Sequence, residues 1–149
     1  MPTICVQGVD LSYEEKDIIR FDEGLIGMPQ LRRLVLINYS EVAPILLLCS
    51  LDNPQCAFLV LETTPHLPAY TPQFPASLKP QLGWREGESL LTLVTVTIAA
   101  EWTASTVNLR APIVIAPGAM RGAQVILTDS TYQLVEPLPF ASQEAAVGK

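Results

Sequence analysis

The stretch Asn108-Leu109-Arg110-Ala111-Pro112-Ile113-Val114-Ile115 decides how the rest of the chain is interpreted. It starts with polar side chains, is interrupted by a proline, and continues as β-branched residues, which favour strands. Pro112 has no backbone N–H to donate to a β-ladder, so we expect it at a strand start, a sheet edge or a bulge. The stretch therefore predicts an interrupted sheet beside Asn108 and Arg110, and it marks these two side chains as candidates for recognition.

Runs rich in Val, Ile, Leu and Thr recur on both sides of this stretch, and each is bounded by Gly, Pro, Asn or Asp. In the longest run, Val94, Val96 and Ile98 share one face while Thr95 and Thr97 share the other, as in a strand with one buried face. Many short strands separated by turn signals indicate an all-β domain, either a barrel or a sandwich of short antiparallel strands. The predicted strands are 3–9, 34–37, 45–51, 57–62, 91–98, 113–115 and 124–127.

A proline-rich segment interrupts this pattern. Five of the 13 prolines fall within residues 65–80, so this segment cannot be a central strand. We expect a short helical excursion near residues 72–83, with one or two helical turns over 77–82 that stop at Gly83. The segment is either a lid over one end of the domain or a crossover between strands.

Composition bounds the remaining possibilities. The 149 residues are 49% apolar and 16% charged, which is typical of one ordered domain, and we assign it to residues 1–140, followed by a flexible tail over 141–149. Nine Lys and Arg against fifteen Asp and Glu give a net charge of −6, without the basic cluster that nucleic-acid binding requires. The longest apolar runs are too short to cross a membrane.

The cysteines and the single histidine argue against catalysis. Acids such as Asp10 and Glu14 stand where a signal peptide would need an apolar run, so we expect a cytoplasmic protein with three reduced thiols. One His and three scattered Cys supply neither a nucleophile–base pair nor a zinc site. No phosphate-binding loop or dinucleotide motif is present. The chain is therefore expected to be a binding protein without enzymatic activity and without a cofactor.

Acidic residues concentrate near the N-terminus. Six acids fall within the first 23 residues, ending with Asp22 and Glu23. Such a concentration either steers a basic partner or serves solubility. In the same way, Asp52 and Asn53 either complete a turn before Pro54 or contact a partner. Arg110 either pairs with Glu101 or, together with Asn108, faces a partner across an incomplete sheet edge, where strand addition is available.

Four blocks of the sequence, which follow one another along the chain as they do in that family, resemble the flagellar assembly factor FliW family. The Asn-Leu-Arg-Ala-Pro-Ile run at 108–113 is a hallmark of that family, and residues 18–27 are similar to its apolar strand and Gly-Leu-x-Gly turn. Residues 50–60 are similar to its Asp-rich turn and following strand, and residues 121–132 to its closing hairpin strand. Together the blocks span roughly residues 4–140. The sequence departs from the family pattern in two places. Ala116-Pro117-Gly118 stands where the family commonly has Asn in a more polar hairpin, and the middle region has fewer acids than is usual for the family.

The resemblance implies a partner-switching role. FliW-like proteins bind flagellin in the bacterial cytoplasm and, once flagellin has been secreted, capture the RNA-binding regulator CsrA and relieve its repression of flagellin translation. The implied protein is a monomer when free. Its candidate partner-binding residues are Asn108, Arg110, Asp52, Asn53, Asp22 and Glu23. The alternatives are a chaperone for flagellin alone, a small enzyme using Cys49 or Cys56, and a purely structural component of an assembly.

Overall fold

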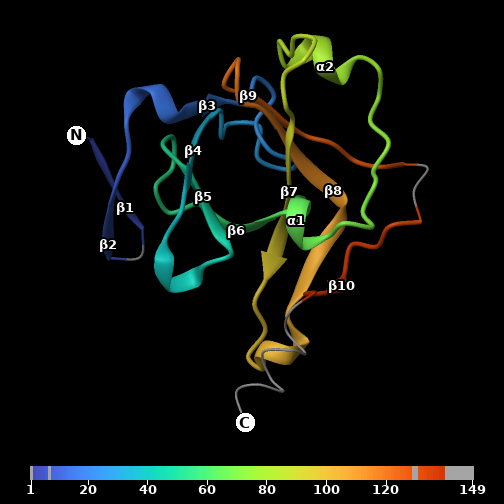
Figure 1. Cartoon of the computed structure of the whole chain (residues 1–149). Coiled ribbons are helices and arrows are strands. Elements are labelled where there is room, and N and C mark those ends of the chain that lie inside the picture. The colour runs from blue at the N-terminus through green and yellow to red at the C-terminus, as the bar shows by residue number, and fades with distance from the viewer. Residues whose placement is uncertain (1, 7, 129–130, 140–149) are drawn as a thin grey trace.

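The computed structural model describes residues 2–6, 8–128 and 131–139. Strands dominate these residues, and the helices are short (Figure 1). The strands are β1 (Thr3–Val6), β2 (Val9–Ser12), β3 (Ile18–Arg20), β4 (Arg33–Ile37), β5 (Leu46–Ser50), β6 (Ala57–Glu62), β7 (Leu91–Thr97), β8 (Thr106–Ala116), β9 (Arg121–Gln124) and β10 (Glu136–Pro137). The helices are α1 (Thr63–His66) and α2 (Leu78–Gln81), with 3-10 turns η1 (Glu15–Asp17), η2 (Ser40–Val42) and η3 (Trp102–Ala104).

Seven strands, β3 to β9, close into a barrel. Neighbours from β3 to β8 in chain order pair antiparallel, and β8 turns back into β9. The ring closes where β9 meets β3 in parallel, with Arg20 opposite Arg121. Outside the ring, β10 pairs with the start of β8 (Figure 1). The all-β, barrel-like fold predicted from the sequence is confirmed.

The barrel interior is filled by alternate strand residues. Leu34, Leu48, Val60 and Leu93 are fully buried in one cluster around Phe21. Gly122 is needed beside that ring, because a Cβ at this position would lie 2.6 Å from Cζ of Phe21. Removing these apolar surfaces from water supplies most of the folding free energy.

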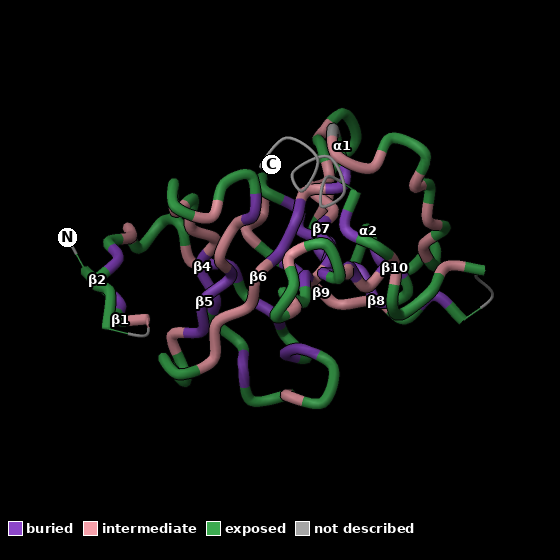
Figure 2. The backbone as a smooth tube through the Cα atoms, turned by 90° about the horizontal axis from the view of Figure 1, so that it is seen from below, coloured by how far each residue is buried: buried purple, intermediate pink, exposed green. Residues whose placement is uncertain are grey.

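Two additions cover the outer wall of the barrel. The β1–β2 hairpin lies to one side of the barrel and packs Ile4 and Leu11 against Val35 and Cys49, on the outward faces of β4 and β5 (Figure 2). On β8, Val114 and Ala116 are covered by Leu78 and Leu82 of the α2 segment. The proline-rich excursion therefore covers part of the barrel wall. The helix α2 ends at Gln81, and Gly83 just after it adopts a left-handed φ of +69° at the predicted stop.

Several predicted strand boundaries are wrong. The run 3–9 is two strands, β1 and β2, because Gly8 adopts φ +84° and reverses the chain into a hairpin. The run 124–127 forms a strand at 121–124 instead, since the hairpin from β8 pairs Ile113–Ala116 with those residues. The run 113–115 is the end of an eleven-residue strand whose polar first half hid it.

No helix in the described part of the chain is long and apolar enough to cross a bilayer. The tail predicted over 141–149 lies outside the described residues.

Candidate partner-binding surface

Strand β8 carries a large bulge where it passes Pro112. On one side of the bulge Asn108 lies opposite Thr95 of β7, and on the other side Ile113 lies opposite Leu93. Two steps along β7 therefore match five steps along β8, so residues 109–112 bulge out opposite Val94. Pro112 was predicted at an edge, a strand start or a bulge, and it lies in a bulge.

Every backbone polar group of the bulge has a partner. The N–H groups of Arg110 and Ala111 donate to Oδ1 of Asn108 at 3.0 and 3.2 Å, and that of Leu109 donates to the Gln133 carbonyl at 3.0 Å. Pro112 has no N–H to satisfy. The carbonyls of residues 109, 110, 111 and 112 accept in turn from Tyr70 Oη (2.5 Å), Leu127 N (2.9 Å), Gln124 Nε2 (3.1 Å) and Val125 N (2.9 Å).

Asn108 and Arg110 differ in what their side chains do. The Asn108 amide oxygen holds the bulge together, so its first role is structural. Arg110 is exposed, and among the described residues its guanidinium forms no ion pair, with Glu101 or with any other acid. Strand addition at 108–110 is unavailable because the backbone there is already hydrogen-bonded. A partner contact by either side chain stays a prediction.

Gln124 links the bulge to the turn after β3. Its Nε2 donates to the Ala111 carbonyl, while its Oε1 accepts from Ile26 N at 2.9 Å. That turn is the Gly-Leu-x-Gly block, in which Gly24 has φ +67° and a Cβ there would meet Met28 O at 2.6 Å. Gln124 lies at the start of a strand predicted from the sequence, which predicted no role for its side chain. Its place within the fourth family-like block was the only signal available.

A hollow of about 530 Å³ opens where these segments meet. Its lining combines Leu25, Ile26 and Met28 from the turn, residues 57–59 of β6, residues 95–98 at the end of β7, and Ile113 and Gln124. All four family-like blocks therefore contribute to one surface. Asn108 lies directly opposite Thr95, one of the lining residues.

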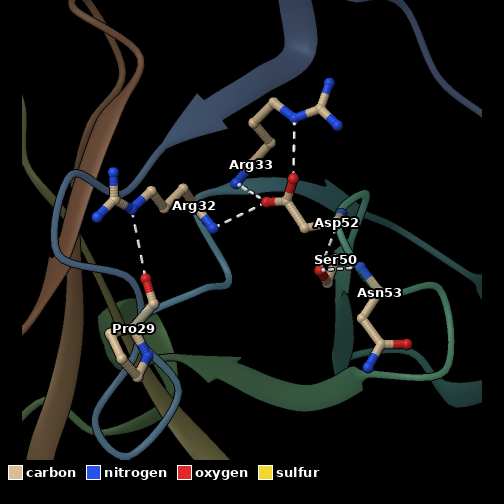
Figure 3. Close-up of polar contacts among 6 residues, drawn as sticks. All are labelled: Pro29, Arg32, Arg33, Ser50, Asp52 and Asn53. Carbon is tan, nitrogen blue, oxygen red and sulfur yellow. Dashed lines mark hydrogen bonds and ion pairs between the residues drawn. The ribbon is translucent and has the colours of Figure 1, made fainter.

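Asp52 has a structural role elsewhere on the barrel. Its carboxylate accepts from the backbone N–H groups of Arg32 (2.9 Å) and Arg33 (2.8 Å) and pairs with Arg33 Nε at 3.2 Å (Figure 3). Partial burial alone would raise the pKa of this carboxyl, but the hydrogen bonds and the charge of Arg33 together outweigh it and lower the pKa. Asp52 thereby joins the start of β4 to the β5–β6 turn.

The other predicted partner-binding residues lie around the same barrel strands. Asn53 completes the β5–β6 turn, donating its N–H to Ser50 Oγ at 3.0 Å and accepting from Gln55 N at 3.2 Å. Asp22 pairs with Arg121 across the closing strands at 3.3 Å, with 60% of its side chain exposed. Glu23 is exposed beside it. Contact of these residues with a partner stays a prediction.

Cys49, one of the two candidate nucleophilic thiols, is fully buried. Burial raises the pKa of the Cys49 thiol to about 11, so at neutral pH it is a protonated, inaccessible side chain. Within the described part of the chain, no three His, Cys, Asp or Glu side chains gather closely enough to hold a metal ion.

A family model described as FliW protein matches residues 7–138. The chain belongs to the FliW family. Named "Flagellar assembly factor FliW", a protein of Caldanaerobacter subterraneus subsp. tengcongensis is 35% identical over 129 residues, covering 86% of each chain. A FliW of the same description from Geobacter sulfurreducens is 30% identical over 141 residues, covering 94% of this chain and 88% of that protein.

The barrel is also that of a solved FliW. A crystal structure of the flagellar assembly factor FliW superposes with a TM-score of 0.84 at 30% identity, covering 92% of this chain and 96% of that one. The names of these FliW proteins describe flagellar assembly and no reaction. The family resemblance predicted from the four sequence blocks is confirmed.

Proposed function

We propose that this chain binds flagellin and, when flagellin is absent, captures the RNA-binding regulator CsrA, so that flagellin level controls flagellin translation. Membership of a family of flagellar assembly factors carries this proposal. In it the chain acts in the cytoplasm as a monomer, without a cofactor and without catalysing a reaction. Both partners are proteins.

The charge of the chain supports the CsrA half of the proposal. A net charge of −6 draws a basic RNA-binding protein toward this surface and repels the phosphates of competing RNA. The N-terminal acids are suitably placed, since Asp10 and Glu15 are exposed on and beside the β1–β2 hairpin. Bound near the RNA site of CsrA, such carboxylates would lower its affinity for RNA.

Calorimetric titration with the host's flagellin and, separately, with CsrA tests the proposal at two salt concentrations. We expect saturable binding to both, and an affinity for CsrA that falls as salt rises because exposed charges are screened. Binding of flagellin alone would leave a chaperone without the regulatory role. Binding of neither would refute the proposal.

A charge variant tests whether the N-terminal acids contribute to CsrA binding. The double variant Asp10→Asn/Glu15→Gln removes two exposed charges from the N-terminal region and should weaken CsrA binding and its salt dependence while leaving flagellin binding unchanged. The matched control Glu86→Gln/Glu101→Gln removes two exposed charges elsewhere. Equal losses in both variants would mean that only net charge matters.

A further inference from the structure

The pairing of β6 with β7 stops halfway along β6. The register runs from Glu62 opposite Leu93 to Val60 opposite Thr95 and ends there. Residues 57–59 continue to pair with β5 on one side, and β7 continues along β8 to Thr97 opposite Thr106. The two strands therefore part, and we call the stretch between residues 57–59 and 96–98 the open seam.

The hollow described above fills this seam. It is lined by three consecutive residues of β6, and by residues 95–97 at the end of β7 together with Ile98 just beyond it. Successive side chains of a strand point to opposite faces, so a hollow lying on one face would be lined only by alternate residues. Contact with consecutive residues on both strands places the hollow against the strand edges.

Backbone groups on the β6 edge point into the seam. Ser50 N donates to the Cys56 carbonyl at 3.0 Å, so the polar groups of Cys56 face β5. Backbone polar groups of successive strand residues alternate between the two neighbouring strands. Ala57 and Leu59 consequently direct theirs away from β5, toward β7. The last rung of the β6–β7 ladder, Val60 opposite Thr95, uses the Leu59 carbonyl, so the Leu59 N–H and the groups of Ala57 lie where the pairing has ended. An edge of this kind is a template for an additional strand.

The lining selects for an uncharged segment. The described lining holds no charged side chain, although the chain as a whole carries −6. Its rim exposes Ile26 and Ile98, at 43% and 42%, and its polar groups are the hydroxyls of Thr95 and Thr97 and the amide of Gln124. A charged segment would be desolvated here without a counter-charge.

We propose that the open seam takes an extended, uncharged segment of a protein partner as an added strand beside β6. This inference deepens the proposed function, because it gives one partner's binding a place and a mode. The added strand would satisfy the N–H of Leu59 and the backbone groups of Ala57, which lie beyond the last rung of the β6–β7 ladder, and would bury Ile26 and Ile98. Main-chain bonds supply affinity in this mode, and the apolar lining supplies selectivity.

Two threonines that face each other across β7 and β8 give a matched test. Thr97 lines the seam, whereas its register partner Thr106 does not. A lysine at position 97 puts a charge into the seam, so Thr97→Lys should weaken flagellin or CsrA binding about tenfold or more. Thr106→Lys should leave both affinities unchanged. Thermal unfolding of both variants establishes that each remains folded.

Amide hydrogen exchange tests the added strand itself. In the free protein the amides of Ala57 and Leu59 should exchange faster than those of Phe58 and Val60, and binding of the partner should slow the first pair. Slow exchange of Ala57 and Leu59 in the free protein would overturn the inference, because the edge would already be satisfied.

The outcomes separate this inference from the proposed function. If the wild-type chain binds its partners and Thr97→Lys binds them equally well, the seam proposal fails and the function stands. If the wild type binds neither protein, the function fails. The seam is then judged with an acetylated, amidated heptapeptide of alternating Val and Thr. Slower exchange at Ala57 and Leu59 with millimolar peptide supports the seam, and unchanged exchange overturns it.

Discussion

Replacing Asn108 by alanine should destabilise the barrel more than an ordinary surface polar substitution. The change removes the oxygen that accepts from Arg110 N and Ala111 N at 3.0 and 3.2 Å. Ala111 is 7% exposed, so its unpaired N–H should cost about 1–3 kcal/mol, and the N–H of Arg110, which water can reach, about 0.5–1.5 kcal/mol. We expect Asn108→Ala to lower the free energy of unfolding by about 2–4 kcal/mol.

Urea denaturation followed by tryptophan fluorescence measures this loss. Asn108→Asp keeps an acceptor oxygen at the same place and should stay within about 1 kcal/mol of the wild type. Asn53→Ala removes one 3.2 Å bond in an exposed turn and should cost about 0.5–1 kcal/mol. If Asn108→Ala costs no more than Asn53→Ala, the bulge does not depend on the Asn108 side chain and our account of it is wrong.

Three further predictions concern the turn after β3, the loss of stability at acidic pH, and the reactivity of the cysteine thiols. Gly24→Ala should lower the free energy of unfolding by roughly 2 kcal/mol or more, because the added Cβ would lie 2.6 Å from the Met28 carbonyl oxygen. Gly27→Ala should cost only about 1 kcal/mol, for its positive φ, because a Cβ there would meet nothing within 4 Å. The pKa of Asp52 is lower in the folded state, so the stability it contributes is present above its unfolded pKa and is lost as pH falls through the folded pKa; Asp52→Asn should therefore flatten the acid limb of the stability–pH curve. At pH 8, iodoacetamide should label exposed Cys5 and leave Cys49, whose pKa is raised to about 11, unmodified until the chain unfolds.

Each of these has a distinct contrary result. Equal losses for the two glycine variants in thermal or urea unfolding would show that crowding by the Met28 carbonyl is relieved by small shifts. An acid limb that keeps its slope in Asp52→Asn would assign the acid sensitivity to other carboxyls. Rapid native labelling of Cys49, read by mass spectrometry of the peptide that contains it, would show that the β1–β2 hairpin opens readily and would revive the thiol-enzyme alternative.

Local patterns in the sequence were sufficient to predict an all-β domain of short strands, as a barrel or a sandwich; the closing contact between β9 and β3, which makes it a barrel, joins distant segments. Alternation in residues 91–98 identified β7, and the missing N–H of Pro112 required an irregularity, which the structure shows as a bulge. Both inferences depend on neighbouring residues only. The strand at 106–108 was missed because its backbone pairs with β7 and β10, and pairing between segments distant in the chain leaves no periodic pattern in the local sequence.

The candidate site was harder to predict for the same reason. Asp52 and Asn53 were predicted either to complete a turn or to contact a partner. Asn53 bonds within the β5–β6 turn and Asp52 links that turn to β4, while partner contact by either residue stays a prediction. The role of Gln124 arises only when residues nearly a hundred positions apart meet, as Ile26 and Gln124 do. The open seam is a place where pairing ends, and the strands on either side of it look like ordinary strands in the sequence.

The parallel contact that closes the barrel bears on how the chain is made. Arg20 meets Arg121, Asp22 pairs with Arg121, and Ile26 bonds to Gln124, so the first third of the chain is completed by its last third. During synthesis, β3 to β8 can pair in the order in which they leave the ribosome, but the edge of β3 stays open until the segment around Gln124 has emerged. A nascent chain halted before that point would present an unpaired strand to its neighbours, and the ring can close only after residues 121–124 have emerged.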